Sequence, residues 1–221
     1  MHEEDEGLDE VVSAGIRIGE PQISDKALDL ILKYEVGGGE SYYNKFLYRP
    51  TWPGLNSGVT IGIGYDLGYN NLQSFKAAWS TKVSTQDIIR LARTLGVRGR
   101  SAKELIPGVK DIKISWEHAL SVFKTNTIPI FTNQTNKAFP GADKLHPDAY
   151  GALVSLVFNR GSDLTGGRRV EMARIRSLVP VKDYKSIAHE IRKMKRLWVN
   201  AGANGLLKRR EDEAKLVESC I

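Results

Sequence analysis

The chain has 221 residues, of which 41% are hydrophobic, and a net charge of +6. This length and composition suit one globular domain with a sizeable core. No apolar run reaches the about 18 residues that a membrane-spanning helix needs, so no membrane insertion is expected. Cys220 is the single cysteine, which excludes a scaffold built on internal disulfides.

The first ten residues contain six acidic side chains and no lysine or arginine, which leaves about +12 on residues 11–221. Such a start lacks the basic region of a signal peptide, so we expect synthesis in the cytoplasm without one. The charge predicts that residues 1–21 are a disordered acidic segment, or the remnant of a linker from a larger protein. One domain is then expected over residues 22–221.

A helix is predicted from Asp25 to Glu35, because Leu28, Ile31 and Leu32 follow the spacing of one helix face. The next position on that face is Glu35. A carboxyl there is drawn out of water by its own helix and is expected to keep its proton, as a general acid must. The alternative is a glutamate at a frayed helix end that faces solvent.

The stretch 36–57 is rich in Gly, Pro, Tyr and Trp and predicts a loop or irregular strand, not a helix. After it, apolar side chains alternate with Thr60 and two glycines over 59–64, which predicts a short strand. Glycine in a strand allows another backbone or a ligand to approach closely. An ordinary tight hairpin is the alternative reading of these glycines.

The rest of the chain predicts helices. Five helices are expected, at Ser84 to Gly96, Ser115 through Phe123, Pro147 to Gly161, Asp183–Val199 and Leu206–Leu216. A capping box at Ser101–Glu104 predicts the start of another helix, and Pro129 is expected to interrupt the helical region that begins at Ser115. The fold class expected from these elements is α+β, mostly helical with a small antiparallel sheet.

No cofactor or metal is expected, because the four histidines are scattered without the spacing of metal ligands. Nucleic acid is not expected as a partner either. The basic residues lie mostly on helical patterns without interleaved aromatic side chains, and no nucleic-acid-binding motif accompanies them. A basic domain also suits the phosphates of a bacterial cell wall.

Three motifs resemble phage-type lysozymes of glycoside hydrolase family 24. They occur in the order of that family and span roughly residues 22–217: Glu35 followed by Thr60-Ile-Gly-Ile-Gly64, the stretch Leu153-Val-Ser-Leu-Val-Phe-Asn-Arg-Gly161, and the pattern Gly205-Leu-Leu-Lys-Arg-Arg-Glu-Asp-Glu213. The resemblance implies a lysozyme-like fold with a small sheet lobe beside a helical lobe. It implies a muramidase that needs no cofactor.

One departure concerns the second carboxylate. Phage lysozymes usually carry an Asp nine residues after the catalytic Glu, where this chain has Asn44. Asp66 instead lies six residues after Thr60, a spacing similar to that of pesticin-type muramidase domains. The resemblance therefore implies that Glu35 is the acid, Thr60 positions water and Asp66 is the second carboxylate. Asp66 could instead anchor the turn at the strand end.

The resemblance also implies a sugar-binding cleft that includes Phe158 and Asn159, while Phe158 could be only a core residue. Tyr65 and Trp52 are candidate sugar-stacking aromatics that could equally be packing residues. The arginines and the glutamate of the third motif are expected to form a partly buried ion-pair cluster that ties the last helix to its lobe. Those residues are Arg209, Arg210 and Glu213.

The expected substrate is bacterial peptidoglycan, cleaved between N-acetylmuramic acid and N-acetylglucosamine in the periplasm or cell wall of a target bacterium. A monomeric phage endolysin and a secreted toxin domain are both consistent with this, and a toxin would have a periplasmic immunity protein as its partner. The alternatives are a lytic transglycosylase, a chitosanase-like enzyme, and a non-catalytic module that binds cell wall or nucleic acid.

Overall fold

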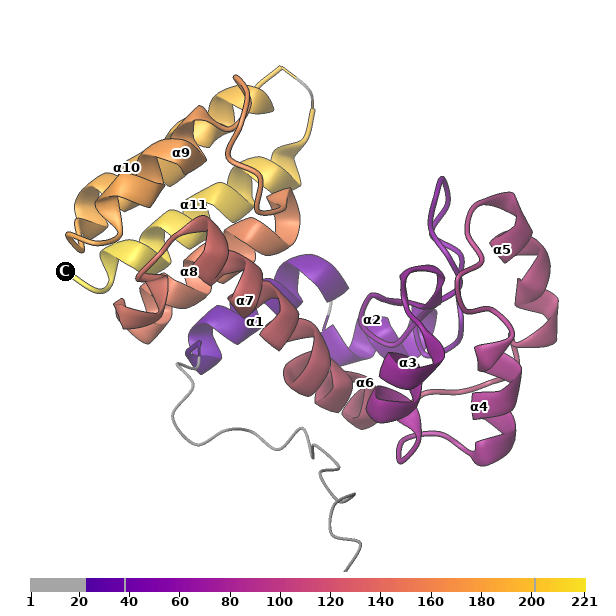
Figure 1. Ribbon diagram of the computed structural model, residues 1–221. Helices are drawn as coiled ribbons and strands as arrows, with labels where there is room; N and C mark the ends of the chain where they lie inside the picture. Colours follow the sequence, from indigo (N-terminus) through magenta and orange to yellow (C-terminus); the bar gives the residue numbers. More distant parts are fainter. Residues whose placement is uncertain (1–22, 38, 201) are drawn as a thin grey trace, which may run out of the picture.

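The computed structural model describes residues 23–37, 39–200 and 202–221. The acidic segment predicted at 1–21 lies outside these described residues. The chain is 64% helical with one small antiparallel sheet, which confirms the expected α+β class. Figure 1 shows α2 to α5 on one side, α8 to α11 on the other, and α1 and α7 running between them.

The first half of the chain forms the lobe that contains the sheet. Its elements are α1(Asp25–Val36), α2(Gly39–Phe46), β1(Thr60–Ile61), β2(Tyr65–Asp66), η1(Leu67–Tyr69), α3(Leu72–Trp79), α4(Thr85–Ala92), α5(Arg100–Leu105) and η2(Ile106–Gly108). The two strands pair with Thr60 opposite Asp66 and Ile61 opposite Tyr65.

The second half forms the helical lobe. Its elements are α6(Trp116–Val122), the π-helical turn η3(Phe123–Thr127), α7(Ile128–Ala138), η4(Ala142–Lys144), α8(Pro147–Arg160), α9(Val170–Leu178), α10(Tyr184–Lys193), η5(Met194–Leu197) and α11(Asn204–Glu218). The last two long helices, α10 and α11, pack against each other, and α11 also packs on α8.

Several predicted helix starts are confirmed by their caps. Ser84, Ser115 and Asp183 each accept a hydrogen bond from a backbone N–H of the first turn of their helix. Pro147 begins α8, and Gly161 ends it with a positive φ of 75°.

Two local predictions are wrong. Residues 39–46 form the helix α2 instead of irregular chain, because its one buried side chain, Tyr43, is too weak a pattern to reveal the helix. Ser101 does not cap α5: Gly99 precedes the helix with a φ of +66°, a conformation that favours glycine, and Ser101 lies inside the first turn.

The predicted strand over 59–64 is a tight hairpin in which only Thr60 and Ile61 form β1. Gly62 and Gly64 make the turn with φ values of +58° and +72°. A side chain at Gly62 would also lie 2.8 Å from Cη2 of Trp79. The glycines are therefore required by the turn and by its packing on α3.

Helix α8 is the centre of the helical lobe, since every residue from Asp148 to Val157 is buried. Its Gly151 faces α1, where an added Cβ would overlap the Cβ of Ala27 and come within 3.1 Å of the Cβ of Ile23. The two helices thus approach closely, which fixes the position of α1 and of the residues at its end. Among the described residues, no helix is both long and apolar enough to cross a membrane.

Candidate functional site

Glu35 lies in the last turn of α1, just before Gly37 ends the helix. The buried side chains of this helix are Ala27, Leu28, Ile31 and Val36. The prediction that Glu35 continues the buried face is wrong: its side chain keeps 28% of its exposure. The reason is that Val36, the next residue in the helix, is buried in the core, so that Glu35 lies at the edge of the core.

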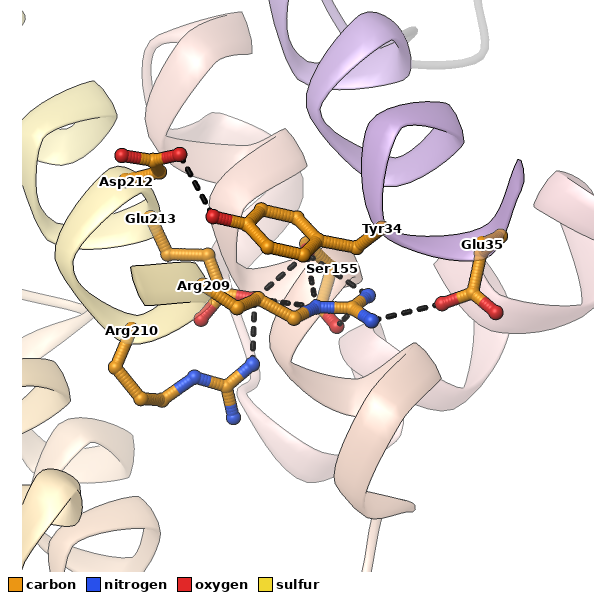
Figure 2. A network of polar contacts seen from close by, with 7 residues as sticks. All are labelled: Tyr34, Glu35, Ser155, Arg209, Arg210, Asp212 and Glu213. Atoms are coloured by element: carbon orange, nitrogen blue, oxygen red, sulfur yellow. Dashed lines mark hydrogen bonds and ion pairs between the residues drawn. The ribbon is translucent and has the colours of Figure 1, made fainter. Parts of the chain in front are cut away.

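The Glu35 carboxylate forms an ion pair with Arg209 of α11, with 2.7 Å between Oε1 and Nη1. Figure 2 shows the guanidinium lying between Glu35 and the residues of α8 and α11. Its other nitrogens donate to the backbone carbonyl of Ser155 (3.1 Å), to the Ser155 hydroxyl and to Glu213 (3.2 Å). Arg209 is therefore held in place by α8 and α11 independently of Glu35.

Glu213 is the buried centre of this network. Its Oε1 accepts from the Ser155 hydroxyl at 2.6 Å, from Arg209 at 3.2 Å and from Arg210 at 2.6 Å, and its side chain is 0% exposed. Burial lowers the pKa of Arg210, and the Glu213 carboxylate opposes this shift. The expected cluster of Arg209, Arg210 and Glu213 is confirmed, and it is more deeply buried than predicted.

Tyr34 and Asp212 extend the network on the solvent side of Arg209. The Tyr34 hydroxyl donates to Asp212 at 2.7 Å, and the Tyr34 ring lies 5.4 Å from the centre of the Arg209 guanidinium. Burial and the neighbouring carboxylate raise the pKa of Tyr34. Sequence reasoning missed Tyr34, Ser155 and Asp212, because only the fold brings these three helices together.

Two adjoining cavities share Glu35 in their walls. One, of about 250 Å³, is largely apolar and is lined by Glu35, Val36, Leu47, Ile63, Gly64, Thr127, Phe131 and Phe158. The other, of about 340 Å³, is lined by Tyr34, Glu35, Asn159, Ala203, Gly205, Leu206 and Arg209. Among the described residues that line them, Glu35 is the one acid.

The two cleft residues expected from the end of α8 both lie at these cavities. Phe158 lines the first one and packs against Phe131, with 4.2 Å between the ring centres. Asn159 lines the second one and is exposed. The amide of Asn159 can both donate and accept a hydrogen bond there.

Thr60 and Asp66 lie across from each other in the hairpin, and neither is among the residues that line the two cavities. The Thr60 hydroxyl donates to the carbonyl of Gly58 at 3.4 Å. The Asp66 carboxylate accepts from the N–H of Gly58 with both oxygens (3.0 and 3.1 Å) and from the N–H of Gly68 at 2.8 Å. These are the contacts of a residue that anchors a turn.

Tyr65 and Trp52 also lie away from both cavities. Tyr65 is 8% exposed and meets Trp79 edge-on, with 5.6 Å between ring centres, and burial raises its pKa. The indole N–H of Trp52 donates to the carbonyl of Ser57 at 3.0 Å, and Lys103 lies over its ring. Both aromatic rings therefore make packing contacts in the sheet lobe.

One set of side chains could hold a metal ion. The ligand atoms of His146, Asp148 and Cys220 lie within 4.8 Å of one another at the start of α8. His146 Nδ1 already accepts from the N–H of Asp148 at 3.2 Å and lies 3.4 Å from the Cys220 sulfur. Asp148 is paired with Lys26. This group lies at the opposite end of α8 from Asn159, so it is separate from the site around Glu35.

No curated protein matches this chain. A family model does match: it covers residues 31–210, which include both Glu35 and Arg209, and its description assigns no activity. Because the match covers more than half of the sequence, the chain belongs to the family described as "Domain of unknown function (DUF8812)".

Proposed function

We propose that the protein is a bacteriolytic peptidoglycan hydrolase, a lysozyme-type muramidase in which Glu35 is the proton donor. The observation that carries this proposal is the position of the Glu35 carboxylate, which opens onto two adjoining cavities and is held from behind by the buried Arg209. Cleavage of a glycosidic bond needs a carboxyl beside the leaving oxygen. The expected cleft residues Phe158 and Asn159 line the same two cavities.

Glu35 must carry a proton at the start of the reaction and a charge after it. As a carboxylate, it is stabilised by Arg209 at 2.7 Å. When it is protonated, Arg209 keeps its bonds to Ser155 and Glu213, so the guanidinium is not left without partners.

In the hydrolytic mechanism Thr60 positions a water molecule, and Asp66 takes its proton as the water attacks the anomeric carbon. Asp66 can do so only if it loosens its contacts with the N–H groups of Gly58 and Gly68. The proton of Glu35 goes to the leaving oxygen in the same step, so the charges balance.

A lytic transglycosylase is the second candidate, favoured by the commitment of Asp66 to the turn. In that reaction a hydroxyl of N-acetylmuramic acid attacks its own anomeric carbon while Glu35 protonates the leaving oxygen. The resulting Glu35 carboxylate then accepts the proton of the attacking hydroxyl. One carboxyl is sufficient for this chemistry, and Glu35 is the one acid among the described residues that line the cavities.

Muropeptide release from purified sacculi tests the proposal. Glu35→Gln should lower release by about 100-fold or more, because it removes the proton donor. The matched control is Glu40→Gln, since Glu40 is an exposed acid in the first turn of α2, and its release should equal that of the wild type. Release by folded Glu35→Gln at the wild-type rate would contradict the proposal.

The products separate the two candidates. New reducing ends indicate hydrolysis, whereas anhydro-muramic ends without incorporation of labelled water indicate a transglycosylase. Binding to sacculi without any cleavage would instead support a wall-binding module. Cleavage of chitosan in preference to sacculi would support a chitosanase-like enzyme.

The proposed site of action is the periplasm or cell wall of a target bacterium, reached either as a phage endolysin or as a secreted toxin domain. For a toxin, we propose a periplasmic immunity protein that covers the cavities around Glu35. Capture of such a protein from the producer's periplasm by the inactive Glu35→Gln variant tests this, and a producer that is lysed by its own exported protein contradicts it.

A further inference from the structure

Three arginines lie at the end of α8 and in the segment that follows it, where the carboxylates of Glu171 and Asp163 are also close enough to act on Arg160 and Arg169. Within the described part of the chain, Arg160, Arg168 and Arg169 form no ion pair. Arg160 donates to the backbone carbonyl of Arg168. Arg169 donates to the sulfur of Met172, which is a weak acceptor.

These arginines also lie close together. Gly161, the residue after Arg160, is so near to Arg169 that an added Cβ would lie 4.0 Å from its Nη2. The guanidinium of Arg160 lies 5.0 Å from the Trp198 ring, and the buried Arg210 lies 5.9 Å from the same ring. Trp198 thus holds Arg160 beside the loop that carries the other two arginines.

Several donors in this region are unsatisfied. The Nε of Arg160 is buried without a hydrogen-bond partner, and so are Nε and Nη1 of Arg210, whose side chain is fully buried. A buried donor without an acceptor is unfavourable, and more so when it is charged. In native proteins such atoms usually meet a water molecule or an ion.

Two nearby carboxylates, those of Glu171 and Asp163, are already bound to other groups, whereas Oε2 of Glu213 is buried beside Arg210 without a hydrogen-bond partner. Glu171 accepts from Arg196, with 3.1 Å between Oε2 and Nη2. Asp163 accepts from the N–H and the hydroxyl of Thr165. Burial and repulsion by Arg169, Arg210 and Arg168 lower the pKa of Arg160 to about 10, and the Glu171 carboxylate opposes this shift. The region therefore carries an excess of positive charge.

We infer that Arg160, Arg168 and Arg169 form a binding site for a phosphate group. A phosphate offers several acceptor oxygens in a tetrahedral arrangement, which guanidinium groups from neighbouring positions can share, and its charge offsets more than one of them. A carboxylate offers only two oxygens and one charge. Arg160 directly follows Asn159, which lines the second cavity, but none of the three arginines is among the residues that line it.

This inference goes beyond the proposed function and does not depend on it. The phosphate can come from free inorganic phosphate or from the phosphodiester backbone of an anionic wall polymer, because the two share the same oxyanion chemistry.

The test uses the full chain carrying Glu35→Gln, so that no hydrolysis can interfere. Sodium phosphate is titrated by calorimetry and by thermal unfolding, with sodium chloride at the same ionic strength as the reference. Phosphate should bind and raise the Tm beyond the chloride reference. Arg169→Gln should weaken phosphate binding by about tenfold, and Arg168→Gln should act in the same direction.

The matched control is Arg100→Gln, which removes an exposed arginine at the start of α5 and should leave phosphate binding unchanged. Equal phosphate binding by wild type and by folded Arg168→Gln and Arg169→Gln would overturn the inference, as would no binding beyond the chloride reference. Titration with polyglycerol phosphate assigns the source: tighter binding than inorganic phosphate indicates the polymer, and weaker binding indicates the free ion.

Discussion

Arg209 and Glu35 lie 174 residues apart in sequence and form an ion pair of 2.7 Å. The pair joins α11 to the end of α1 at the wall of two cavities. The candidate proton donor is thus positioned by a side chain from the far end of the folded chain.

Replacing Arg209 tests this positioning. Arg209→Lys keeps the charge, but it cannot reach Glu35, Ser155 and Glu213 together as the planar guanidinium does. We expect a loss of about 1–3 kcal/mol in the free energy of unfolding, measured in urea, and slower muropeptide release. Lys208→Gln, on the exposed face of the same helix, should change neither quantity. Full activity of Arg209→Lys would show that the pair does not position Glu35.

Glu213 should matter for stability more than any surface acid. Glu213→Gln removes the charge that Arg209 and Arg210 share in a fully buried place. Breaking such a pair leaves uncompensated buried charge and should cost about 3–5 kcal/mol in urea unfolding. The exposed Glu104 provides the control, since Glu104→Gln should stay within about 0.5 kcal/mol of the wild type. Similar stabilities of the two variants would mean that the buried network is not tightly coupled.

Asp66 can be tested as a turn anchor. Its carboxylate accepts from the N–H groups of Gly58 and Gly68, and charged hydrogen bonds of this kind contribute about 1.5–3 kcal/mol each. Asp66→Asn should lower the Tm, because the charge is lost and the NH₂ that replaces one oxygen cannot accept the second bond from the N–H of Gly58, although the remaining oxygen can still accept from Gly58 and Gly68. Gly58→Ala should destabilise as well, since an added Cβ would overlap the Asp66 carboxylate and Gly68. A stable Asp66→Asn protein without lytic activity would instead favour Asp66 as the second catalytic carboxylate.

The close contact of α1 and α8 predicts that a substitution in one helix can be compensated by a substitution in the other. Gly151→Ala would place a methyl group against Ala27, and overpacking of this kind costs about 1–3 kcal/mol. The shift of α1 should also move Glu35 and slow muropeptide release. Adding Ala27→Gly makes room for the new methyl and should restore part of both the Tm and the activity. Absence of any rescue would indicate that the cost of Gly151→Ala arises elsewhere.

Protonation of Glu171 at acidic pH should lower the stability of the folded protein. Although burial acts to raise it, the hydrogen bond from Arg196 holds the pKa of Glu171 below its ordinary value. The contribution of Glu171 to the free energy of unfolding is therefore complete at a pH above the ordinary pKa of a glutamate. It is lost as the pH falls through the lowered pKa that Glu171 has in the folded protein. Arg196→Gln should lower the Tm at pH 7, and this difference should shrink as the pH falls below about 4. A difference that stays constant with pH would contradict this origin.

Helix starts were predictable where a single side chain decides them, as Ser84, Ser115 and Asp183 do. Helix α2 was not predictable, because its sequence has one buried tyrosine and therefore carries no periodic pattern of apolar residues. Helices α3 and α9, at Leu72–Trp79 and Val170–Leu178, are absent from the predictions. The start of α3 does carry a local signal, because Asn71 accepts a hydrogen bond from the N–H of Ser74, whereas α9 has no side-chain cap.

For the site, local spacing predicted a special role for Glu35 but gave the wrong burial. The resemblance of the motif around Arg209 led to the buried ion-pair cluster, yet only the fold shows that Arg209 contacts Glu35. Contacts between residues this far apart leave no trace in local periodicity. The same holds for Tyr34 and Asp212.

The separation of Glu35 and Arg209 in the sequence also determines when their ion pair can form during synthesis. A ribosome that adds about 5–20 residues per second needs on the order of ten seconds or more to make α11 after α1 has emerged. Through that interval a nascent chain carries the glutamate without its guanidinium, so the pair is among the last features of the molecule to form. A producing cell would thus contain unfinished chains that have not yet formed this ion pair.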